Sequence, residues 1–223
     1  MSRRTALITG ATSGIGRATA YEFAKQGIGL VLCGRRQERL DTLEKELSQQ
    51  TQVLTLQFDV RDKASTFKAI DGLPEDFKSI DILINNAGNA HGLDPIDTGN
   101  TDDWDAMIDI NVKGLLYVSK AVIPSMTERR SGHIINIGSS AGKEVYPKGN
   151  VYCASKHAVL AITEGMRIDL NPFGIKVSAI NPGLVETEFS KVRFKGDPRA
   201  DKVYKGYKPL QPEDIADIIY FVV

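Results

Sequence analysis

The chain has 223 residues, and its 28 Lys and Arg balance 28 Asp and Glu, so the formal net charge at pH 7 is zero. This balance provides no basic surface for nucleic acid or an acidic membrane, and we expect neither as a partner. No apolar run approaches the ~20 residues of a membrane-spanning helix, and the amino end lacks the apolar region of a signal peptide. The two cysteines, Cys33 and Cys153, make neither a disulfide framework nor a metal site. We expect a soluble cytoplasmic protein without a bound metal.

Short aliphatic runs recur along the chain and predict strands. They cover residues 5–9, 29–33, 53–58, 82–85, 133–137 and 176–180. Their nearly continuous apolar character is typical of strands buried on both faces of a parallel sheet. The stretches between them have helical spacing, as at Leu40, Leu43 and Leu47. This alternation predicts one α/β domain over residues 1–223, with a doubly wound parallel sheet and helices on both faces.

A glycine-rich loop follows the first predicted strand and precedes a helical pattern. Its residues are Gly10, Ala11, Thr12, Ser13, Gly14, Ile15 and Gly16. Glycines permit a tight turn and let the backbone approach a pyrophosphate, which then binds the free N–H groups at the start of the helix. The spacing differs from the usual dinucleotide fingerprint, and no Walker-type lysine follows. We predict a dinucleotide site here; a plain tight turn is the alternative.

The end of the second predicted strand indicates which dinucleotide binds. Folds that bind NAD place an acidic residue there, on the ribose 2′-hydroxyl. This chain has Gly34, Arg35 and Arg36 at that place and no acid. Guanidinium groups pair well with a 2′-phosphate. The sequence therefore predicts NADP(H) rather than NAD(H), the alternative being a surface pair at the start of a solvated helix.

Three side chains suit the reduction of a carbonyl group. Tyr152 and Lys156 are four residues apart in a helical stretch, and Ser139 follows the fifth predicted strand. Free tyrosine has a pKa of about 10, so we expect Lys156 and an oxidised nicotinamide to favour its ionised form. Ser139 is expected to hydrogen-bond the substrate oxygen. The alternatives are ordinary structural roles for a core tyrosine, a solvated lysine and a turn serine.

The segment after the last predicted strand breaks the alternation. Residues 184–209 carry scattered Gly, Pro, Lys and Arg with little periodicity. Such a segment in a compact domain is usually functional or mobile. It follows a strand, so we expect it to lie over the carboxyl ends of the sheet and to cover the substrate. The alternative is a surface loop without a functional role.

The order of these motifs resembles the short-chain dehydrogenase/reductase family. The matching residues are the glycine loop, Asn85 to Gly88, Asn111, Ser139, Tyr152, Lys156 and Asn181 to Gly183. The resemblance spans nearly the whole chain and implies one Rossmann-like domain. It implies that Asn111 completes a catalytic set with Ser139, Tyr152 and Lys156 and holds a water beside the lysine. It also implies cofactor contacts by Tyr152, Lys156, Asp59, Val60, Asn86, Ala87, Gly88, Pro182, Gly183, Val185 and Thr187.

Further stretches are similar to the NADP-dependent 3-hydroxy acid dehydrogenases, which act on allo-threonine and serine and reduce malonic semialdehyde. They include residues 34–40 and 182–190. This resemblance implies interconversion of a small 3-hydroxy acid, such as L-allo-threonine, L-serine or 3-hydroxypropionate, with its 3-oxo acid or semialdehyde. The carboxylate of such a substrate needs a cation. Arg193 and Lys195 are the candidates in the loop, and Lys143 and Lys148 are weaker ones.

Two other functions stay open at this point. A reductase of bulkier ketones, of keto-acyl or steroid type, would have a more apolar loop than residues 184–209. A non-catalytic dinucleotide sensor would have a broken Ser, Tyr and Lys set. The family resemblance also implies a homotetramer whose interface includes a final strand. The sequence ends inside the preceding helix, at 212–223, so the tetramer prediction depends on that strand.

Overall fold

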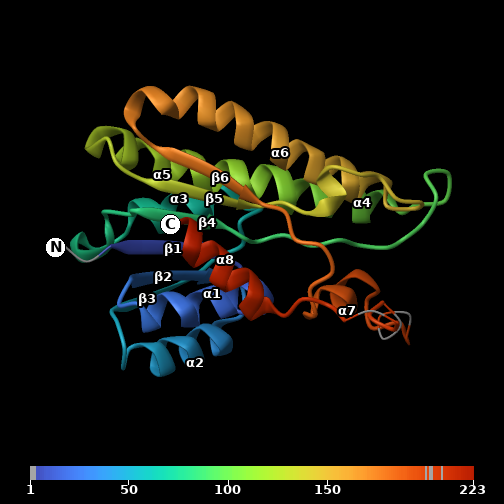
Figure 1. Cartoon of the computed structure of the whole chain (residues 1–223), viewed down its shortest axis with the longest axis horizontal. Coiled ribbons are helices and arrows are strands. Elements are labelled where there is room, and N and C mark those ends of the chain that lie inside the picture. The colour runs from blue at the N-terminus through green and yellow to red at the C-terminus, as the bar shows by residue number, and fades with distance from the viewer. Residues whose placement is uncertain (1–3, 199, 201–202, 207) are drawn as a thin grey trace.

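The computed structural model describes residues 4–198, 200, 203–206 and 208–223, and these form one six-stranded parallel sheet (Figure 1). The strands are β1 (Thr5–Thr9), β2 (Gly29–Gly34), β3 (Val53–Gln57), β4 (Ile82–Asn85), β5 (His133–Ile137) and β6 (Lys176–Ile180). The order is β3-β2-β1-β4-β5-β6, so the direction of winding reverses between β1 and β4. Open α/β sheets bind ligands at such a switch point, beyond the carboxyl ends of the strands. The predicted doubly wound sheet is confirmed.

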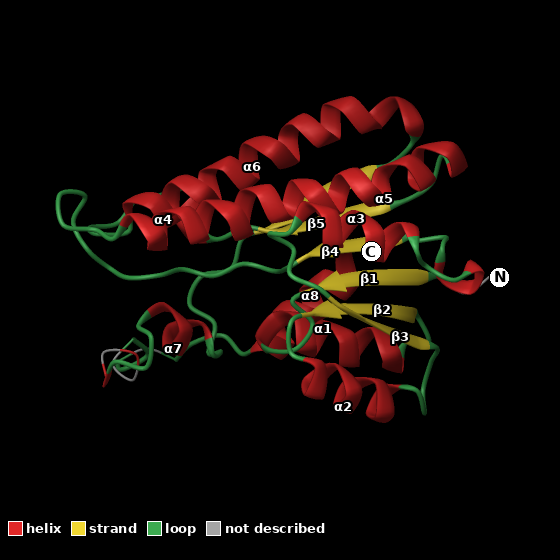
Figure 2. Ribbon diagram, turned by 180° about the vertical axis from the view of Figure 1, so that it is seen from behind, coloured by secondary structure: helices red, strands yellow, loops and turns green. Residues whose placement is uncertain are grey.

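Helices cover both faces of the sheet (Figures 1 and 2). One face carries α1 (Gly14–Lys25), α2 (Gln37–Leu47) and α8 (Pro212–Val222), and the other carries α3 (Lys63–Asp71), α5 (Leu115–Arg129) and α6 (Asn150–Leu170). Two shorter helices, α4 (Thr101–Ile108) and α7 (Phe189–Arg193), lie toward the end of the molecule to which the strand arrowheads point in Figure 2.

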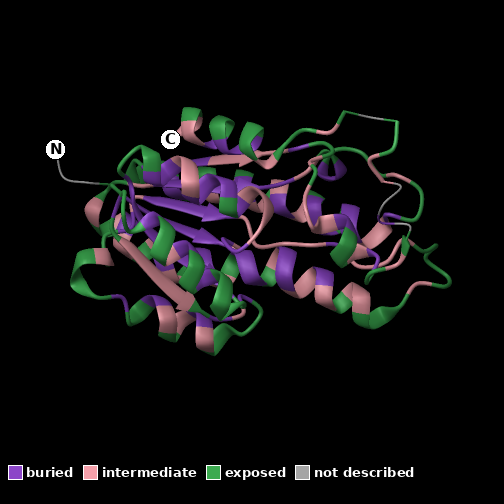
Figure 3. Cartoon of the chain, turned by 90° about the horizontal axis from the view of Figure 1, so that it is seen from below, coloured by how far each residue is buried: buried purple, intermediate pink, exposed green. Residues whose placement is uncertain are grey.

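The two layers have separate apolar cores, because successive strand residues face opposite sides of the sheet. Ala6 and Ile8 of β1 pack with α1, α2 and α8, whereas Leu7 packs with α3 and α5. The central strands are buried throughout (Figure 3). The prediction of burial on both faces is wrong for β3 and β6, which are largely half-exposed. These two strands are the edges of the sheet, with a neighbour on one side only.

The segment 184–209 is more regular than its composition predicts. Helix α7 interrupts it, and Val185 pairs with Leu210 in a short parallel bridge. Four of its positions, 199, 201, 202 and 207, lie outside the described residues. Thr187, Glu188, Phe189 and Val192 line a cleft at the carboxyl ends of the strands. At least residues 187–192 of the segment therefore lie beside those ends, and its role in covering the substrate stays a prediction.

Candidate active site

The glycine loop turns sharply between β1 and α1. Gly10 and Gly14 have φ angles of +65° and +50°, which favour glycine. Gly16 is needed for space, because a Cβ there would lie 2.4 Å from Asn86 Nδ2 and 2.5 Å from the Gly10 carbonyl oxygen. The start of α1 can therefore approach Gly10 and Asn86 this closely only with glycine at position 16.

A second loop, Asn86 to Gly88, is tied to the glycine loop. Asn86 Nδ2 donates hydrogen bonds to the carbonyl oxygens of Thr9 (2.9 Å) and Gly10 (3.2 Å). The hydroxyl of Thr9 accepts the backbone N–H groups of Asn86 and Ala87, both at 3.0 Å. These bonds hold the two loops together at the switch point between β1 and β4.

The start of α1 suits a negatively charged ligand. Its N-cap residue, Ser13, makes no side-chain cap hydrogen bond, and the first turn contains no acidic residue. The first N–H groups of a helix have no partners within the helix, and the helix dipole favours an anion there. Thr12, Ser13, Gly14 and Ile15 at this point all line the cleft. The residues present therefore fit the pyrophosphate of a dinucleotide.

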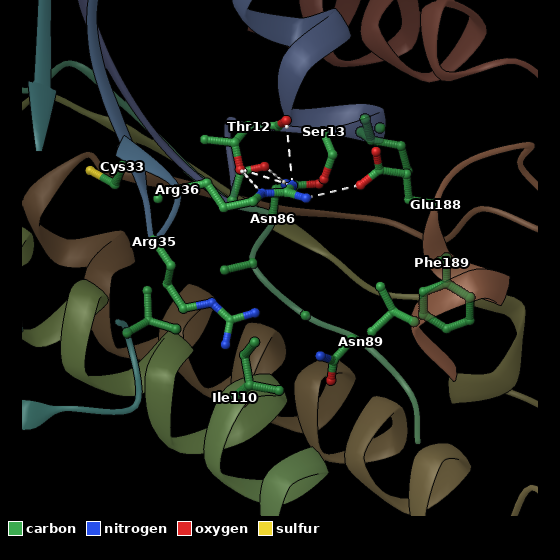
Figure 4. A pocket seen from close by; sticks show the side chains of 18 of the residues that line it. Thr12, Ser13, Cys33, Arg35, Arg36, Asn86, Asn89, Ile110, Glu188 and Phe189 are labelled. Carbon is green, nitrogen blue, oxygen red and sulfur yellow. Dashed lines mark hydrogen bonds and ion pairs between the residues drawn. The ribbon is translucent and has the colours of Figure 1, made fainter. Parts of the chain in front are cut away.

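Arg35 and Arg36 also line this cleft, with Arg36 beside Thr12 (Figure 4). Arg36 donates from Nη2 to Thr12 Oγ1 at 3.1 Å and from Nη1 to Glu188 Oε2 at 3.0 Å. Arg35 points toward Ile110, and its Nη1 lies 3.6 Å from Asp59 Oδ2. Arg39, which the sequence analysis did not single out, donates to Glu188 Oε1 at 2.9 Å. It follows Arg36 by one turn of α2, and this spacing was the signal that could have revealed it.

The cleft brings together most of the predicted cofactor residues. They are Gly10, Thr12, Ser13, Gly14, Ile15, Arg35, Arg36, Asp59, Val60, Asn86, Ala87, Gly88 and Thr187. Its other lining residues went unpredicted, namely Cys33, Gly34, Phe58, Asn89, Ile110, Glu188, Phe189 and Val192. Phe58 and Asn89 adjoin predicted residues, so their proximity in sequence was the available signal.

Other predicted cofactor residues do not line this cleft. Ala11 is buried, and its N–H donates to the Cys33 carbonyl oxygen at 3.1 Å. Pro182 accepts from Ser140 N at 2.9 Å, and Val185 pairs with Leu210. Gly16 and Gly183 are also absent from the lining. Tyr152 and Lys156, which were also predicted to contact the cofactor, are likewise absent from the lining.

Ser139 and Tyr152 meet beyond the carboxyl end of β5. Ser139 caps the short helical turn Ser140–Gly142, where its Oγ accepts the N–H of Ala141 at 3.1 Å. Its side chain also forms a hydrogen bond with that of Tyr152. Burial raises the pKa of Tyr152 to about 12, against the opposing effects of this hydrogen bond and the charge of Arg193. The phenol is therefore protonated at neutral pH in this structure.

Lys156 is buried one helical turn after Tyr152. Its Nζ donates to the Ile137 carbonyl oxygen at 2.9 Å, and burial lowers its pKa to about 8. Gly88 lies between Lys156 and Asn111, since a Cβ there would be 3.6 Å from Lys156 Nζ and 2.8 Å from Asn111 Oδ1. A side chain at position 88 would therefore separate the lysine from the asparagine.

Asn111 lies in η2 (Asp109–Gly114), a π-helical turn between α4 and α5. Its Oδ1 accepts the N–H of Asn89 at 2.9 Å, and its Nδ2 donates to the Asn89 carbonyl oxygen (2.8 Å) and to Ser155 Oγ (3.0 Å). Such turns occur frequently at functional sites. Asn111 thereby links the loop after β4 to helix α6, which carries Tyr152 and Lys156.

Arg193, at the end of α7, is held beside Tyr152. Its Nε donates to the Gly92 carbonyl oxygen at 2.9 Å, and its Nη1 donates to Tyr146 Oη at 2.8 Å. Its guanidinium carbon lies 5.7 Å from the centre of the Tyr152 ring. Arg193 and Tyr152 line a second, smaller hollow together with His91, whose buried Nδ1 has no hydrogen-bond partner among the described residues.

The predicted lysines are placed less favourably than Arg193. Lys195 is exposed and forms an ion pair with Asp103 at 2.8 Å. Lys148 lines the second hollow, whereas the exposed Lys143 does not. The structure therefore brings Arg193, but not Lys143, to Tyr152.

Three further observations concern the described residues as a whole. Among the described residues, no three His, Cys, Asp or Glu side chains gather closely enough to hold a metal ion. Within the same part of the chain, none of the helices combines the length and the apolar character needed to cross a bilayer. Cys33 and Cys153 are both free and buried.

Known proteins are similar to this chain in sequence and in fold. The short chain dehydrogenase model matches residues 4–197. The NADP-dependent 3-hydroxy acid dehydrogenase YdfG of Salmonella typhi is 47% identical over 218 residues, covering 97% of this chain and 87% of that protein. Sulfoacetaldehyde reductase 2 of Chromohalobacter salexigens is 47% identical over 217 residues, covering 96% and 86%. The closed form of a serine dehydrogenase complexed with NADP+ has a TM-score of 0.94 at 45% identity, covering 98% of this chain and 88% of that one. The chain therefore belongs to the short-chain dehydrogenase/reductase family.

Proposed function

We propose that this chain is an NADP(H)-dependent oxidoreductase that interconverts small 3-hydroxy acids with their 3-oxo acids or semialdehydes. The observation that carries the proposal is the guanidinium of Arg193, held 5.7 Å from the ring centre of Tyr152. A cation beside the proton donor suits a substrate whose carboxylate is close to its reacting carbon. The similar proteins are named for 3-hydroxy acids, sulfoacetaldehyde and serine, all of which are small and bear an acidic group.

The cofactor residues are proposed from their places around the cleft. The glycine loop and the start of α1 hold the pyrophosphate, and Arg35 and Arg36 hold the 2′-phosphate. A dinucleotide held by these residues would supply the hydride acceptor for oxidation, and the hydride donor for reduction, at the carbon that bears the substrate oxygen. The remaining contacts are proposed from the family resemblance. They are Asp59 and Val60 at the adenine, Asn86 to Gly88 at the adjoining ribose, and Pro182, Gly183, Val185 and Thr187 at the nicotinamide; of these last four, only Thr187 lines the cleft.

Tyr152 is proposed as the acid and base at the substrate oxygen. In the reductive direction its phenol donates a proton, which suits its raised pKa of about 12. In the oxidative direction, lowering that pKa to about 7 requires about 7 kcal/mol, at about 1.36 kcal/mol per unit. The positive charges of Lys156 and the oxidised nicotinamide favour the phenolate. Ser139 donates a hydrogen bond to the substrate oxygen, and Asn111 supports a water that connects Lys156 to solvent.

Arg193 is proposed as the ligand of the substrate carboxylate. Two of its nitrogens already bind Gly92 and Tyr146, which fixes the plane of the guanidinium. Lys195 remains the second candidate, but its ion pair with Asp103 competes with a substrate. A reductase of bulkier ketones is less well supported, because a charged side chain occupies the space beside Tyr152.

The proposal is tested by following nicotinamide absorbance with NADP+ or NAD+ and four substrates. These are L-allo-threonine, L-serine, 3-hydroxypropionate and a bulky neutral secondary alcohol. We expect turnover of the hydroxy acids with NADP+. Turnover of the bulky alcohol alone would contradict the carboxylate assignment. Arg35→Asp is expected to raise the Michaelis constant for NADPH far more than that for NADH, with Lys68→Asp on α3 as the control.

The organisation of the protein is proposed on the same basis. One sheet carries both the cofactor loop and the catalytic side chains, so residues 1–223 act as a single cofactor-binding and catalytic domain. We further propose a homo-oligomer, a tetramer by family resemblance, in the reducing environment of the cytoplasm, where thiols such as Cys33 and Cys153 stay free. Sedimentation of the purified protein tests the assembly, and fractionation of the source cells tests the location.

A further inference from the structure

Glu188 connects the segment 184–209 to two arginines at the start of α2, Arg36 and Arg39. Its carboxylate accepts hydrogen bonds from Arg36 Nη1 at 3.0 Å and from Arg39 Nη1 at 2.9 and 3.1 Å. These partners are 152 and 149 residues away in the sequence. Figure 4 shows the Arg36 guanidinium between Thr12 and Glu188, with its donors shared between them. An acidic side chain from the substrate segment thus meets the cationic end of the cofactor cleft.

We infer that Glu188 is a cofactor-specificity residue, whose carboxylate competes with the 2′-phosphate of NADP(H) for Arg36. The inference rests on the proposed function, which assigns the 2′-phosphate to the arginines at the end of β2. A carboxylate and a phosphate both accept bidentate hydrogen bonds from guanidinium groups. When the phosphate binds, it takes over donors that Glu188 otherwise uses.

The charges determine the sign of the effect. Burial raises the pKa of the Glu188 carboxyl, but the hydrogen bonds and charges of Arg36 and Arg39 outweigh burial and hold this pKa below its ordinary value. Glu188 is therefore negative at neutral pH. A fixed negative charge beside a 2′-phosphate repels it, as the acid at the end of the second strand does in folds that prefer NAD. NAD(H) has an uncharged 2′-hydroxyl at this position, so the charge of Glu188 changes its affinity little.

The same contacts limit the size of the effect. The side chains of Glu188, Arg36 and Arg39 are 42%, 43% and 45% exposed, so solvent screens the pairs. Removal of one exposed carboxylate from such a pair is expected to tighten NADPH binding about two- to fivefold. The gain should shrink at high salt, because screened charges repel less.

Glu186 provides a matched control in the same segment. It is exposed, accepts a hydrogen bond from Gln211 Nε2 at 3.1 Å and does not line the cleft. Glu186→Gln and Glu188→Gln remove the same charge from positions two residues apart. Only the second variant frees Arg36 and Arg39, so the comparison separates direct competition from a general change in charge.

The test measures dissociation constants of NADPH and NADH by isothermal titration calorimetry on the full chain. We expect Glu188→Gln to lower the constant for NADPH about two- to fivefold and leave that for NADH unchanged, with no effect of Glu186→Gln. An unchanged or raised NADPH constant in Glu188→Gln, or equal shifts for both cofactors, would overturn the inference alone. A wild-type protein without preference for NADPH would overturn the proposed cofactor and the inference with it. Thermal unfolding of both variants verifies that they are folded.

Discussion

The Tyr146 hydroxyl accepts a hydrogen bond from Arg193 Nη1 at 2.8 Å, and the Arg193 guanidinium carbon lies 5.5 Å from the centre of the Tyr146 ring. Gly92 completes the arrangement, because it accepts from Arg193 Nε at 2.9 Å and donates its N–H to the Arg193 carbonyl oxygen at 3.0 Å. The loop after β4, the loop before α6 and helix α7 are thereby joined around one cation. This cation is oriented before any substrate arrives, which reduces the entropy lost on binding.

If Arg193 binds the substrate carboxylate, its removal should raise the Michaelis constant of a charged substrate more than that of a neutral one. Arg193→Ala is expected to raise the Michaelis constant for a 3-hydroxy acid about tenfold or more, because it removes one charge-assisted pair of about 1.5–3 kcal/mol. Tyr146→Phe should raise it less, since the guanidinium remains but loses one anchor. Steady-state kinetics with the acid and with its neutral methyl ester measure the split. Equal losses for acid and ester would show that Arg193 has only a structural role.

Tyr152→Phe is expected to abolish turnover while NADPH binding persists. The substitution removes the proton donor but keeps the ring, which packs 5.7 Å from that of Phe189. Turnover and cofactor affinity are measured on the same preparation. The control is Tyr220→Phe, which removes a hydroxyl that donates to Gln26 Oε1 at 3.0 Å; neither residue lines the cleft. Activity that survives in Tyr152→Phe would assign the proton donor to another group.

Substitution by alanine is expected to have opposite effects on the free energy of unfolding at Gly16 and at Gly165. Gly16→Ala places a Cβ 2.5 Å from a backbone oxygen, so we expect a loss of about 1–3 kcal/mol in the free energy of unfolding and weaker NADPH binding. Gly165→Ala in α6 meets nothing within 4 Å and should stabilise the protein by up to about 1 kcal/mol. Urea unfolding and NADPH titration measure both variants. A stable Gly16→Ala protein with normal affinity would contradict the described packing of the loop.

The buried His133 is expected to make the protein less stable in mild acid. Burial lowers the pKa of this histidine to about 4, while its Nε2 and Ser178 Oγ form a hydrogen bond of 3.0 Å. The unfolded chain binds a proton near its ordinary pKa of about 6.5, so between that value and about 4 the unfolded state binds more protons. The free energy of unfolding should therefore fall as the pH drops through this window, by up to about 3 kcal/mol from this group.

Urea unfolding of wild type and His133→Gln at several pH values tests this assignment. The variant should lose part of the dependence on pH between about 6.5 and 4, because it removes the titrating group. His157→Gln, at an exposed position on α6, is the control for the loss of an imidazole elsewhere in the fold. Parallel curves for wild type and His133→Gln would mean that other groups account for the acid sensitivity.

The local sequence was sufficient to predict the strands and the order of the motifs. Continuous apolar runs identified the strands, because a central parallel strand buries every residue, and four of the six predicted strands match the observed bounds. The glycine loop was predictable because Gly10, Gly14 and Gly16 meet steric demands within and beside a single turn. The positions of Ser139, Tyr152 and Lys156 followed from a strand end and a helical spacing, which are also local features.

Contacts between distant segments were decided only by the tertiary structure. The partners of Glu188 are 149 and 152 residues away, and Asp103, which binds Lys195, is 92 residues from that lysine. Sequence composition marked residues 184–209 as unusual, but an aperiodic segment has no spacing from which to infer which side chains it presents. Its path over the carboxyl ends depends on packing against loops from β1, β2 and β4 together. For this reason the sequence alone was enough to propose which residues carry the chemistry, whereas the fold decided that Arg193 lies beside Tyr152 and that Lys195 is paired elsewhere.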